Sequence, residues 1–200
     1  MNKIINFPEF IGMNCKMMPF IQGDPESLPK EYRSYSDIVE NNYLDKGRLG
    51  YLTLHESIVS PGTSQRGYNS GGLSRSVHVE VGQYNSKYRW GGGSWGGKNN
   101  VWVDEDTEVL IANNLDNTCR YWNTVDKRFT VDGDLSEYIN DYPEESGILM
   151  KSGEIVKIGV FTPHESMVIN EEVKRQFIRI VGDGVIGKES YFTFNPIIKL

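Results

Sequence analysis

Two of the chain's three histidines lie in patterns suited to binding a metal ion. His78 and Glu80 are two residues apart in the segment 76–81, which reads SVHVEV and is typical of a strand. Side chains alternate between the faces of a strand, so this pair points to one face and the valines to the other. The third candidate ligand is His164, which follows a Thr-Pro turn. Two histidines and one carboxylate form the ligand set that leaves open positions on divalent iron for substrate and oxygen.

Two arginines follow His164 on one predicted strand, 173–181. Arg175 and Arg179 share a face of that strand with Phe177. A planar guanidinium holds a carboxylate through two parallel hydrogen bonds. Either arginine is therefore suited to anchor a dicarboxylate co-substrate.

This ordered set resembles the non-haem iron, 2-oxoglutarate-dependent oxygenases, whose marks are H-x-D/E, a distal histidine and an arginine some ten residues later. The family is built on the cupin-like double-stranded β-helix, a jelly-roll fold. The resemblance implies that His78, Glu80 and His164 hold Fe(II). It also implies that Arg175, at 175 − 164 = 11 positions after the distal histidine, binds 2-oxoglutarate, with Arg179 as the alternate. The expected activity is hydroxylation of an unknown small-molecule or protein substrate.

The resemblance covers about half of the chain, mainly 73–83 and 147–181. The run KSGEIVKIGVFTPHES is similar to the glycine-strand-proline-histidine run of many cupins. The chain departs from the common pattern in three respects. Glutamate replaces the commoner aspartate, as in jumonji-type members; the histidines are 164 − 78 = 86 residues apart; and no serine follows in an R-x-S motif.

Two alternatives belong to other classes. One is a cupin-like enzyme or sensor that uses another divalent metal without 2-oxoglutarate. The other is a catalytically silent β-sandwich that works as a structural or interaction module, a homodimer that forms part of the virion of a large DNA virus. In the silent case His78 is a hydrogen-bonded structural residue and Glu80 pairs with Arg75 or Arg89. His55, flanked by leucines in a predicted strand, is interpreted as structural.

Two further residues are candidates for substrate contact. The stretch WGGGSWGG at 90–97 contains G-x-G-x-x-G, but a strand-like segment follows it, so it lacks the helix that a dinucleotide loop requires. We expect either an aromatic hairpin over the pocket mouth, with Trp95 touching substrate, or a plain tight turn. Arg120 shares a face with Trp122 and is predicted either to meet an anionic substrate or to form an ion pair.

Composition bounds the fold class. The 200 residues, with 21 glycines, suit one mainly β domain: an extended arm at 1–27, a helix at 29–42 and a β-sandwich core at 48–200. The predicted strands are 48–59, 76–82, 86–90, 100–103, 107–113, 117–123, 154–161 and 173–181, with a short helix at 133–142.

Charge and targeting signals exclude several function classes. A net charge of −6 argues against bulk binding to nucleic acid. No signal peptide is recognised and no apolar run is long enough to span a bilayer, so we expect a cytoplasmic or virion protein that is neither secreted nor membrane-bound. The two cysteines, Cys15 and Cys119, are too few for a disulfide framework and are expected to be buried thiols.

Overall fold

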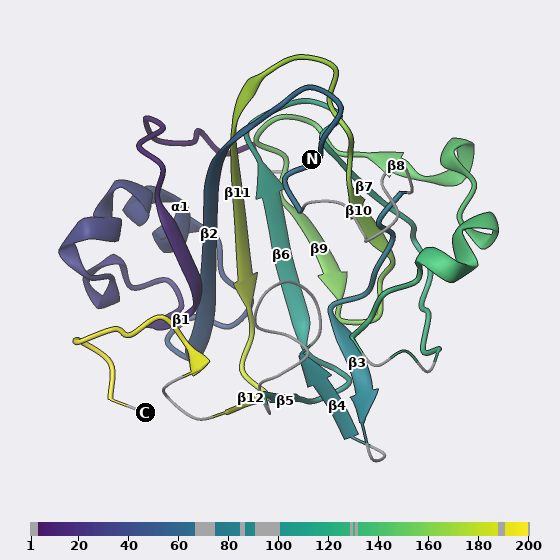
Figure 1. The fold of residues 1–200 in the computed structure, drawn as a ribbon. Helices are drawn as coiled ribbons and strands as arrows, with labels where there is room; N and C mark the ends of the chain where they lie inside the picture. Colours follow the sequence, from purple (N-terminus) through teal and green to yellow (C-terminus); the bar gives the residue numbers. More distant parts are fainter. Residues whose placement is uncertain are drawn as a thin grey trace.

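The computed structural model has a mainly β architecture of antiparallel strands (Figure 1). It describes residues 4–66, 75–84, 87–90, 101–128, 130, 132–187 and 191–199. Three sheets are present in this part of the chain, with five, three and four strands. None of its helices is both long and apolar enough to cross a membrane.

The largest sheet has the strand order β1-β2-β11-β6-β9. Its strands are β1 (Asn14–Ile21), β2 (Leu49–Val59), β11 (Val173–Val181), β6 (Glu108–Asn113) and β9 (Val156–Gly159). Strands β2 and β11 pair along their whole common length, from Val173 opposite Val59 to Val181 opposite Tyr51. This long ladder forms the back of the molecule's central pocket.

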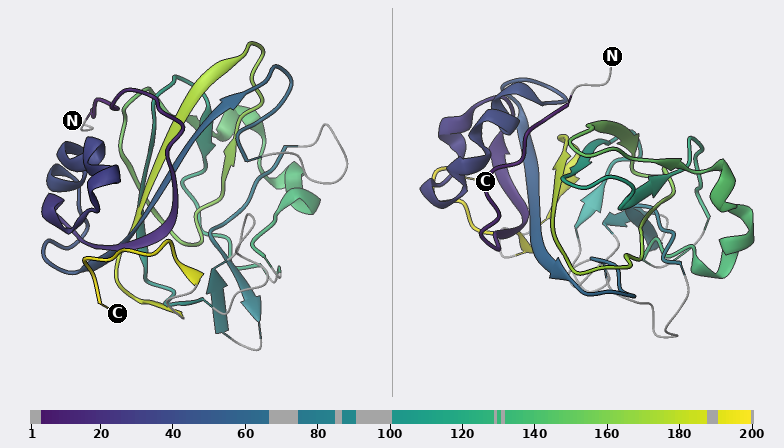
Figure 2. Two further views of the ribbon diagram at one scale, coloured as in Figure 1. Left: turned by 60° about the vertical axis from the view of Figure 1, so that its left-hand side comes forward. Right: turned by 90° about the horizontal axis from the view of Figure 1, so that it is seen from above.

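The two faces of this sheet have different coverings. Leu52 and Ile178 belong to an outer apolar cluster, which the N-terminal helices complete with Tyr35 and Ile38. Figure 2 shows these helices against the side of the sheet formed by β1 and β2. The alternate positions of β2 and β11 point to the inner side, where Thr53, His55, Arg175, Phe177 and Arg179 line the pocket.

The second sheet has the order β10-β7-β8, formed by β10 (His164–Ser166), β7 (Cys119–Tyr121) and β8 (Ile148–Leu149). The segment that contains His78 joins it at the β10 edge, because His78 and His164 each donate their backbone N–H to the other's carbonyl oxygen, both at 2.9 Å. Gly133 lies against the other side of this segment at φ +79°, where its carbonyl accepts the N–H of Val79. A Cβ at position 133 would collide with the Val79 carbonyl oxygen, so the close approach requires glycine.

The third sheet has the order β12-β5-β4-β3 and closes the lower end of the molecule in Figure 1. Its strands are β3 (Val81–Tyr84), β4 (Lys87–Trp90), β5 (Trp102–Val103) and β12 (Val185–Ile186). Strand β3 continues directly from the segment of His78 and Glu80. Trp90, at the end of β4, is buried beneath the pocket beside Arg179.

Most of the predicted strands are confirmed, and three expectations need correction. The arm expected at 1–27 contains strand β1, because Cys15, Met18 and Phe20 are buried in the outer cluster. A bulge, with Met17 at φ 46°, interrupts the alternation that would reveal this strand in the sequence. The helix expected at 29–42 is a 3₁₀-helix, η2 (Lys30–Tyr35), followed by α1 (Ser36–Asn41). The strand expected at 76–82 does not form over its whole length: His78 makes an isolated bridge, and β3 begins at Val81.

Other expectations are confirmed by the described residues. The helix predicted at 133–142 is the 3₁₀-helix η3 (Ser136–Asp141), and Cys15 and Cys119 are buried free thiols. Strands β8, β10 and β12 were not predicted, because they have two or three residues each and are too short to produce a periodic signal. The glycine-rich stretch 91–97, with Trp95, lies outside the described residues.

Candidate functional site

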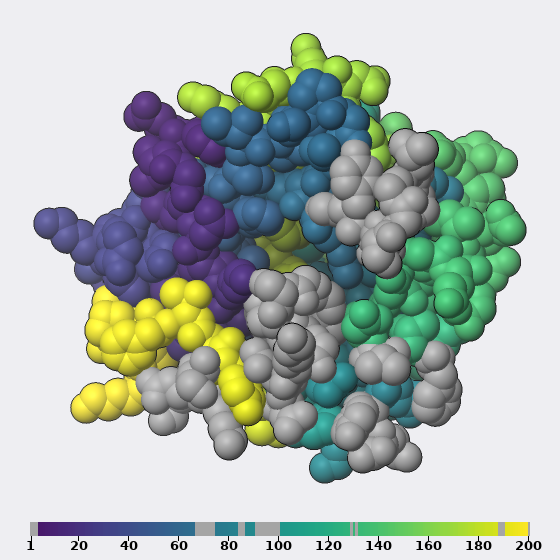
Figure 3. All heavy atoms as spheres, viewed as in Figure 1, coloured from purple at the N-terminus to yellow at the C-terminus, as the bar shows by residue number. Residues whose placement is uncertain are grey.

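A cavity of about 550 Å³ opens between the five-stranded sheet and the β10-β7-β8 sheet. All three histidines line it, together with side chains from β1, β2, β7, β10 and β11. Figure 3 shows the surface hollowed near its centre, where the colour of β11 is visible at depth. This volume lies within the usual range for small-molecule sites, roughly 300–1,000 Å³.

His78 and His164 are held in matching orientations. The Nδ1 of His78 lies 2.9 Å from the carbonyl oxygen of Ser76, and the Nδ1 of His164 lies 2.9 Å from that of Thr162. A carbonyl oxygen only accepts, so each Nδ1 carries the proton and each Nε2 keeps a free lone pair. The two rings are 4.0 Å apart at their centroids and tilted by 57°. Metal-binding histidines commonly have this arrangement, with one nitrogen fixed by the protein and the other left to bind the ion.

Burial keeps both imidazoles neutral. It lowers the pKa of His78 well below its ordinary value, and the positive charge of Arg66 lowers it further. Burial also lowers the pKa of His164, although the negative charge of Glu80 partly opposes this shift. A neutral imidazole is the form that binds metal.

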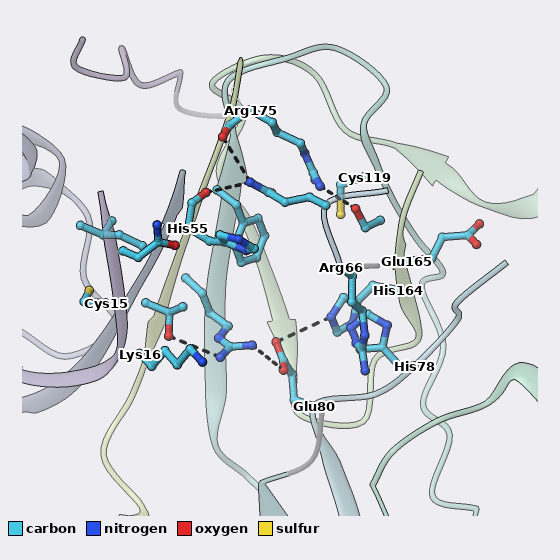
Figure 4. Close-up of a pocket in the computed structure, with 17 residues that line it drawn as sticks. Cys15, Lys16, His55, Arg66, His78, Glu80, Cys119, His164, Glu165 and Arg175 are labelled. Carbon is cyan, nitrogen blue, oxygen red and sulfur yellow. Dashed lines mark hydrogen bonds and ion pairs between the residues drawn. The ribbon is translucent and has the colours of Figure 1, made fainter. Parts of the chain in front are cut away.

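Glu80 has one satisfied and one unsatisfied carboxylate oxygen. Its Oε2 accepts a hydrogen bond of 2.8 Å from Nη1 of Arg179, which is itself held by the Thr53 hydroxyl and stacked 4.7 Å from the Trp90 ring. Its Oε1 is buried, and no donor from the described part of the chain reaches it. That oxygen lies 3.6 Å from Nε2 of His164, and a dashed line joins the two groups in Figure 4. A buried carboxylate oxygen without a donor is costly, so the site lacks a positive partner at this point.

A divalent ion would take its ligands here from side chains that are not yet arranged around it. His164 Nε2 and Glu80 Oε1 lie 3.6 Å apart. Within the described residues, no three His, Cys, Asp or Glu side chains are already arranged as a metal-binding group. Coordination by His78, Glu80 and His164 would therefore require these side chains to move closer together.

Arg66 is a further charged residue at the site, and no pattern in the sequence pointed to it. Figure 4 shows it beside His78 and His164. Burial lowers its pKa to about 10, while the charges of Glu80 and Asp134 act in the opposite direction. It remains a cation at neutral pH, so the cluster that could bind a metal ion also lies next to a guanidinium.

Arg175 is a buried cation that has hydroxyl partners in place of a carboxylate. Its Nε donates to Thr118 Oγ1 at 3.2 Å and its Nη1 donates to Ser166 Oγ at 2.5 Å. None of the ion pairs among the described residues involves it, and burial lowers its pKa to about 10. A buried guanidinium without a counter-ion is suited to an anionic ligand.

Comparison with known proteins assigns the chain to no family. The sequence matches no protein-family model and no curated protein. The function must therefore be inferred from the side chains that the fold brings together.

The structure brings together five of the seven residues predicted for the site. His78, Glu80, His164, Arg175 and Arg179 line one cavity, although they come from three distant segments. The prediction for Trp95 falls outside the described residues.

Arg120 is held by ion pairs outside the pocket. It lies outside the pocket lining, and it binds Glu165 at 3.1 Å and Glu144 at 3.0 Å. Arg75 binds the same Glu165 carboxylate at 2.9 Å, so the expected alternative pairing of Arg75 with Glu80 is wrong. Glu80 pairs with Arg179 instead. We therefore assign Arg120 to an ion-pair cluster behind β10 and not to substrate contact.

His55 lines the pocket, although its sequence context indicated a structural residue. It lies opposite Phe177 in the β2–β11 ladder. Burial lowers its pKa, and the charges of Arg175 and Lys16 lower it further. The repeated letters HES at 55–57 and 164–166 were the one sequence signal that linked it to His164.

Proposed function

We propose that the protein is a non-haem iron, 2-oxoglutarate-dependent oxygenase, with His78, Glu80 and His164 as the ligands of one Fe(II). The observation that carries the proposal is a buried Glu80 oxygen without a donor that lies 3.6 Å from His164 Nε2, in the same cavity as His78, whose Nε2 also has a free lone pair. All three side chains are buried, and each is held by a second contact on its far side. Such outer contacts are typical of metal ligands.

The path of the chain supports the finer fold, a double-stranded β-helix. From β2 the chain passes to the segment of His78, through β3, β4 and β5 of the four-stranded sheet, and then to β6, β7, β8, β9, β10 and β11. Apart from that passage and the step from β7 to β8, it alternates between the five-stranded sheet and the β10-β7-β8 sheet. Alternation of this kind between two facing sheets is expected for a jelly roll. In this fold the candidate ligands belong to the smaller sheet and the candidate anchor arginine to the larger one.

The protein's own residues would bind and orient the reactants. Iron bound at the three ligands would supply the oxygen and electron-transfer chemistry that side chains lack. Arg179 holds one oxygen of Glu80, so only the other oxygen faces His164. Arg175 is then the better anchor for the far carboxylate of 2-oxoglutarate, because its charge is not already neutralised by a carboxylate.

A metal-binding experiment tests this proposal. Mn(II) is titrated into chelator-treated protein, and bound ion is measured by electron paramagnetic resonance. We expect one site in the wild type and its loss in His78→Ala and His164→Ala. His55→Ala is the matched control, because it removes a third imidazole from the same cavity and should retain the site. Full Mn(II) content in His164→Ala would refute the ligand assignment.

Turnover separates this proposal from a cupin-like protein with another metal. We expect wild-type protein with Fe(II) to release succinate from 2-oxoglutarate even without a substrate. Arg175→Gln should keep its metal but lose most of its affinity for 2-oxoglutarate, whereas Arg179→Gln should bind the metal at least as tightly as the wild type, because the ion replaces the positive charge lost beside Glu80. Metal binding without any succinate release would favour the alternative without 2-oxoglutarate.

The charges around Glu80 favour a second candidate, a catalytically silent module. Arg179 binds this carboxylate directly, and Arg66 adds a second positive charge nearby. Two guanidinium groups can stabilise a buried glutamate without any metal ion. The silent module predicts that the wild type binds no Mn(II) in the titration above.

A further inference from the structure

The pocket lining carries more positive than negative charge. The charged residues that line it are Lys16, Arg66, Arg175, Arg179, Glu80 and Glu165. Four cations and two carboxylates give 4 − 2 = +2, in a chain whose net charge is −6. Glu165 is also held by Arg75 and Arg120, and Figure 4 shows its carboxylate directed away from the other side chains. The cavity is therefore a local cationic site in an acidic protein.

This inference rests on the proposed function. Binding of a divalent ion and 2-oxoglutarate would not remove the excess positive charge of the pocket. A divalent ion raises the pocket's formal charge from +2 to about +4, and 2-oxoglutarate, a dianion, returns it to about +2. Co-substrate binding would therefore leave a positive site beside the ligands.

The cavity also has room for a second molecule. 2-Oxoglutarate has ten non-hydrogen atoms and would fill at most about 300 Å³, if each atom took the volume of a water molecule in the liquid. The cavity measures about 550 Å³. Close to half of it therefore remains for a substrate.

We propose that this substrate carries a negatively charged group, a carboxylate or a phosphate, which Arg66 binds next to the metal ligands and Lys16 attracts at the pocket mouth. Arg66 lies beside His78 and His164, whereas Lys16 is exposed on β1 at the opposite side of the pocket in Figure 4. Arg175 is used by the co-substrate and Arg179 by Glu80. Arg66 and Lys16 would thus select an anionic substrate over a neutral one of equal size.

Anion titrations test the proposal directly. Inorganic phosphate and acetate are titrated at constant ionic strength into protein loaded with Mn(II) and N-oxalylglycine, an unreactive analogue of 2-oxoglutarate, and binding is followed by isothermal calorimetry. The two anions distinguish a phosphate site from a carboxylate site. We expect Arg66→Gln to weaken binding about tenfold or more and Lys16→Gln to weaken it several-fold. Lys30→Gln removes the same charge from an exposed site outside the pocket and should change nothing.

The outcomes separate this inference from the proposed function. Equal anion affinity in Arg66→Gln, Lys16→Gln and Lys30→Gln would overturn the inference, as would the absence of binding by either anion. The same titrations without Mn(II) and N-oxalylglycine show whether the site is intact in protein that binds no metal. Selective anion binding without Mn(II) binding would therefore reject the oxygenase and leave an anion-binding pocket formed by Arg66 and Lys16.

Discussion

Replacing Arg179 by methionine tests the electrostatics of the site most directly. The side chains of Arg179 and Glu80 are only 14% and 2% exposed, and their atoms meet at 2.8 Å. Removing one partner of such a buried pair leaves an uncompensated charge, which costs about 3–5 kcal/mol. In a domain of this size each kcal/mol lowers Tm by about 2–4 °C, so 3 kcal/mol corresponds to about 6–12 °C. Arg179→Met should therefore unfold at a clearly lower temperature and urea concentration than the wild type.

Saturating Mn(II) should reduce this loss. An ion between His164 and Glu80 would replace the missing positive charge, so the difference in free energy of unfolding between variant and wild type should shrink. Arg48→Met is the control: its salt bridges to Asp45 and Asp183 join side chains that are more than half exposed, and such pairs contribute about 0–1 kcal/mol. A loss below 1 kcal/mol in Arg179→Met would refute the account of the Glu80 pair. A loss that Mn(II) leaves unchanged would contradict the placement of the ion at Glu80.

Three further predictions concern the surrounding structure. Gly133→Ala should lower the free energy of unfolding by more than about 1 kcal/mol, because the new Cβ meets the Val79 carbonyl oxygen at positive φ; urea denaturation measures this, and an unchanged midpoint would contradict it. Tyr35→Phe removes the 2.6 Å hydrogen bond to Glu56 and should cost about 1–3 kcal/mol in the same assay. Burial raises the pKa of Cys119 from 9.0 to about 11. Between these two values the folded state keeps the thiol protonated, whereas the unfolded chain loses the proton. This contribution to the free energy of unfolding is therefore complete below about pH 9 and declines toward pH 11. Urea denaturation across this range measures the decline, and iodoacetamide labelling of the folded protein measures the protonation of the thiol.

The ligand pair was predictable from sequence because it depends on a local rule. Alternation along an extended segment is enough to place His78 and Glu80 on one face, and both line the pocket. The choice between Arg175 and Arg179 depended on their partners across the sheet. Arg179 lies opposite Thr53 and reaches Glu80, whereas Arg175 meets Thr118. No spacing within 173–181 contains that information.

Other features were hidden for different physical reasons. Strand β1 was missed because its bulge at Met17 breaks the period of two. Arg66 enters the site from a turn, where no periodic pattern identifies the direction of a side chain. Arg120 is as buried as a core residue because it binds two carboxylates. The sequence around it could not distinguish such ion pairs from contact with a ligand.

The reciprocal backbone hydrogen bonds between His78 and His164 have a consequence for engineering. Because the two residues form one directly opposed antiparallel pair, the spacing of their rings is set by main-chain geometry and not by any loop. A slip of one residue would put Pro163 or Glu165 in place of His164. The pair could therefore be transplanted as a short two-strand cassette into another antiparallel scaffold, where register alone should reproduce the 4.0 Å spacing of its rings.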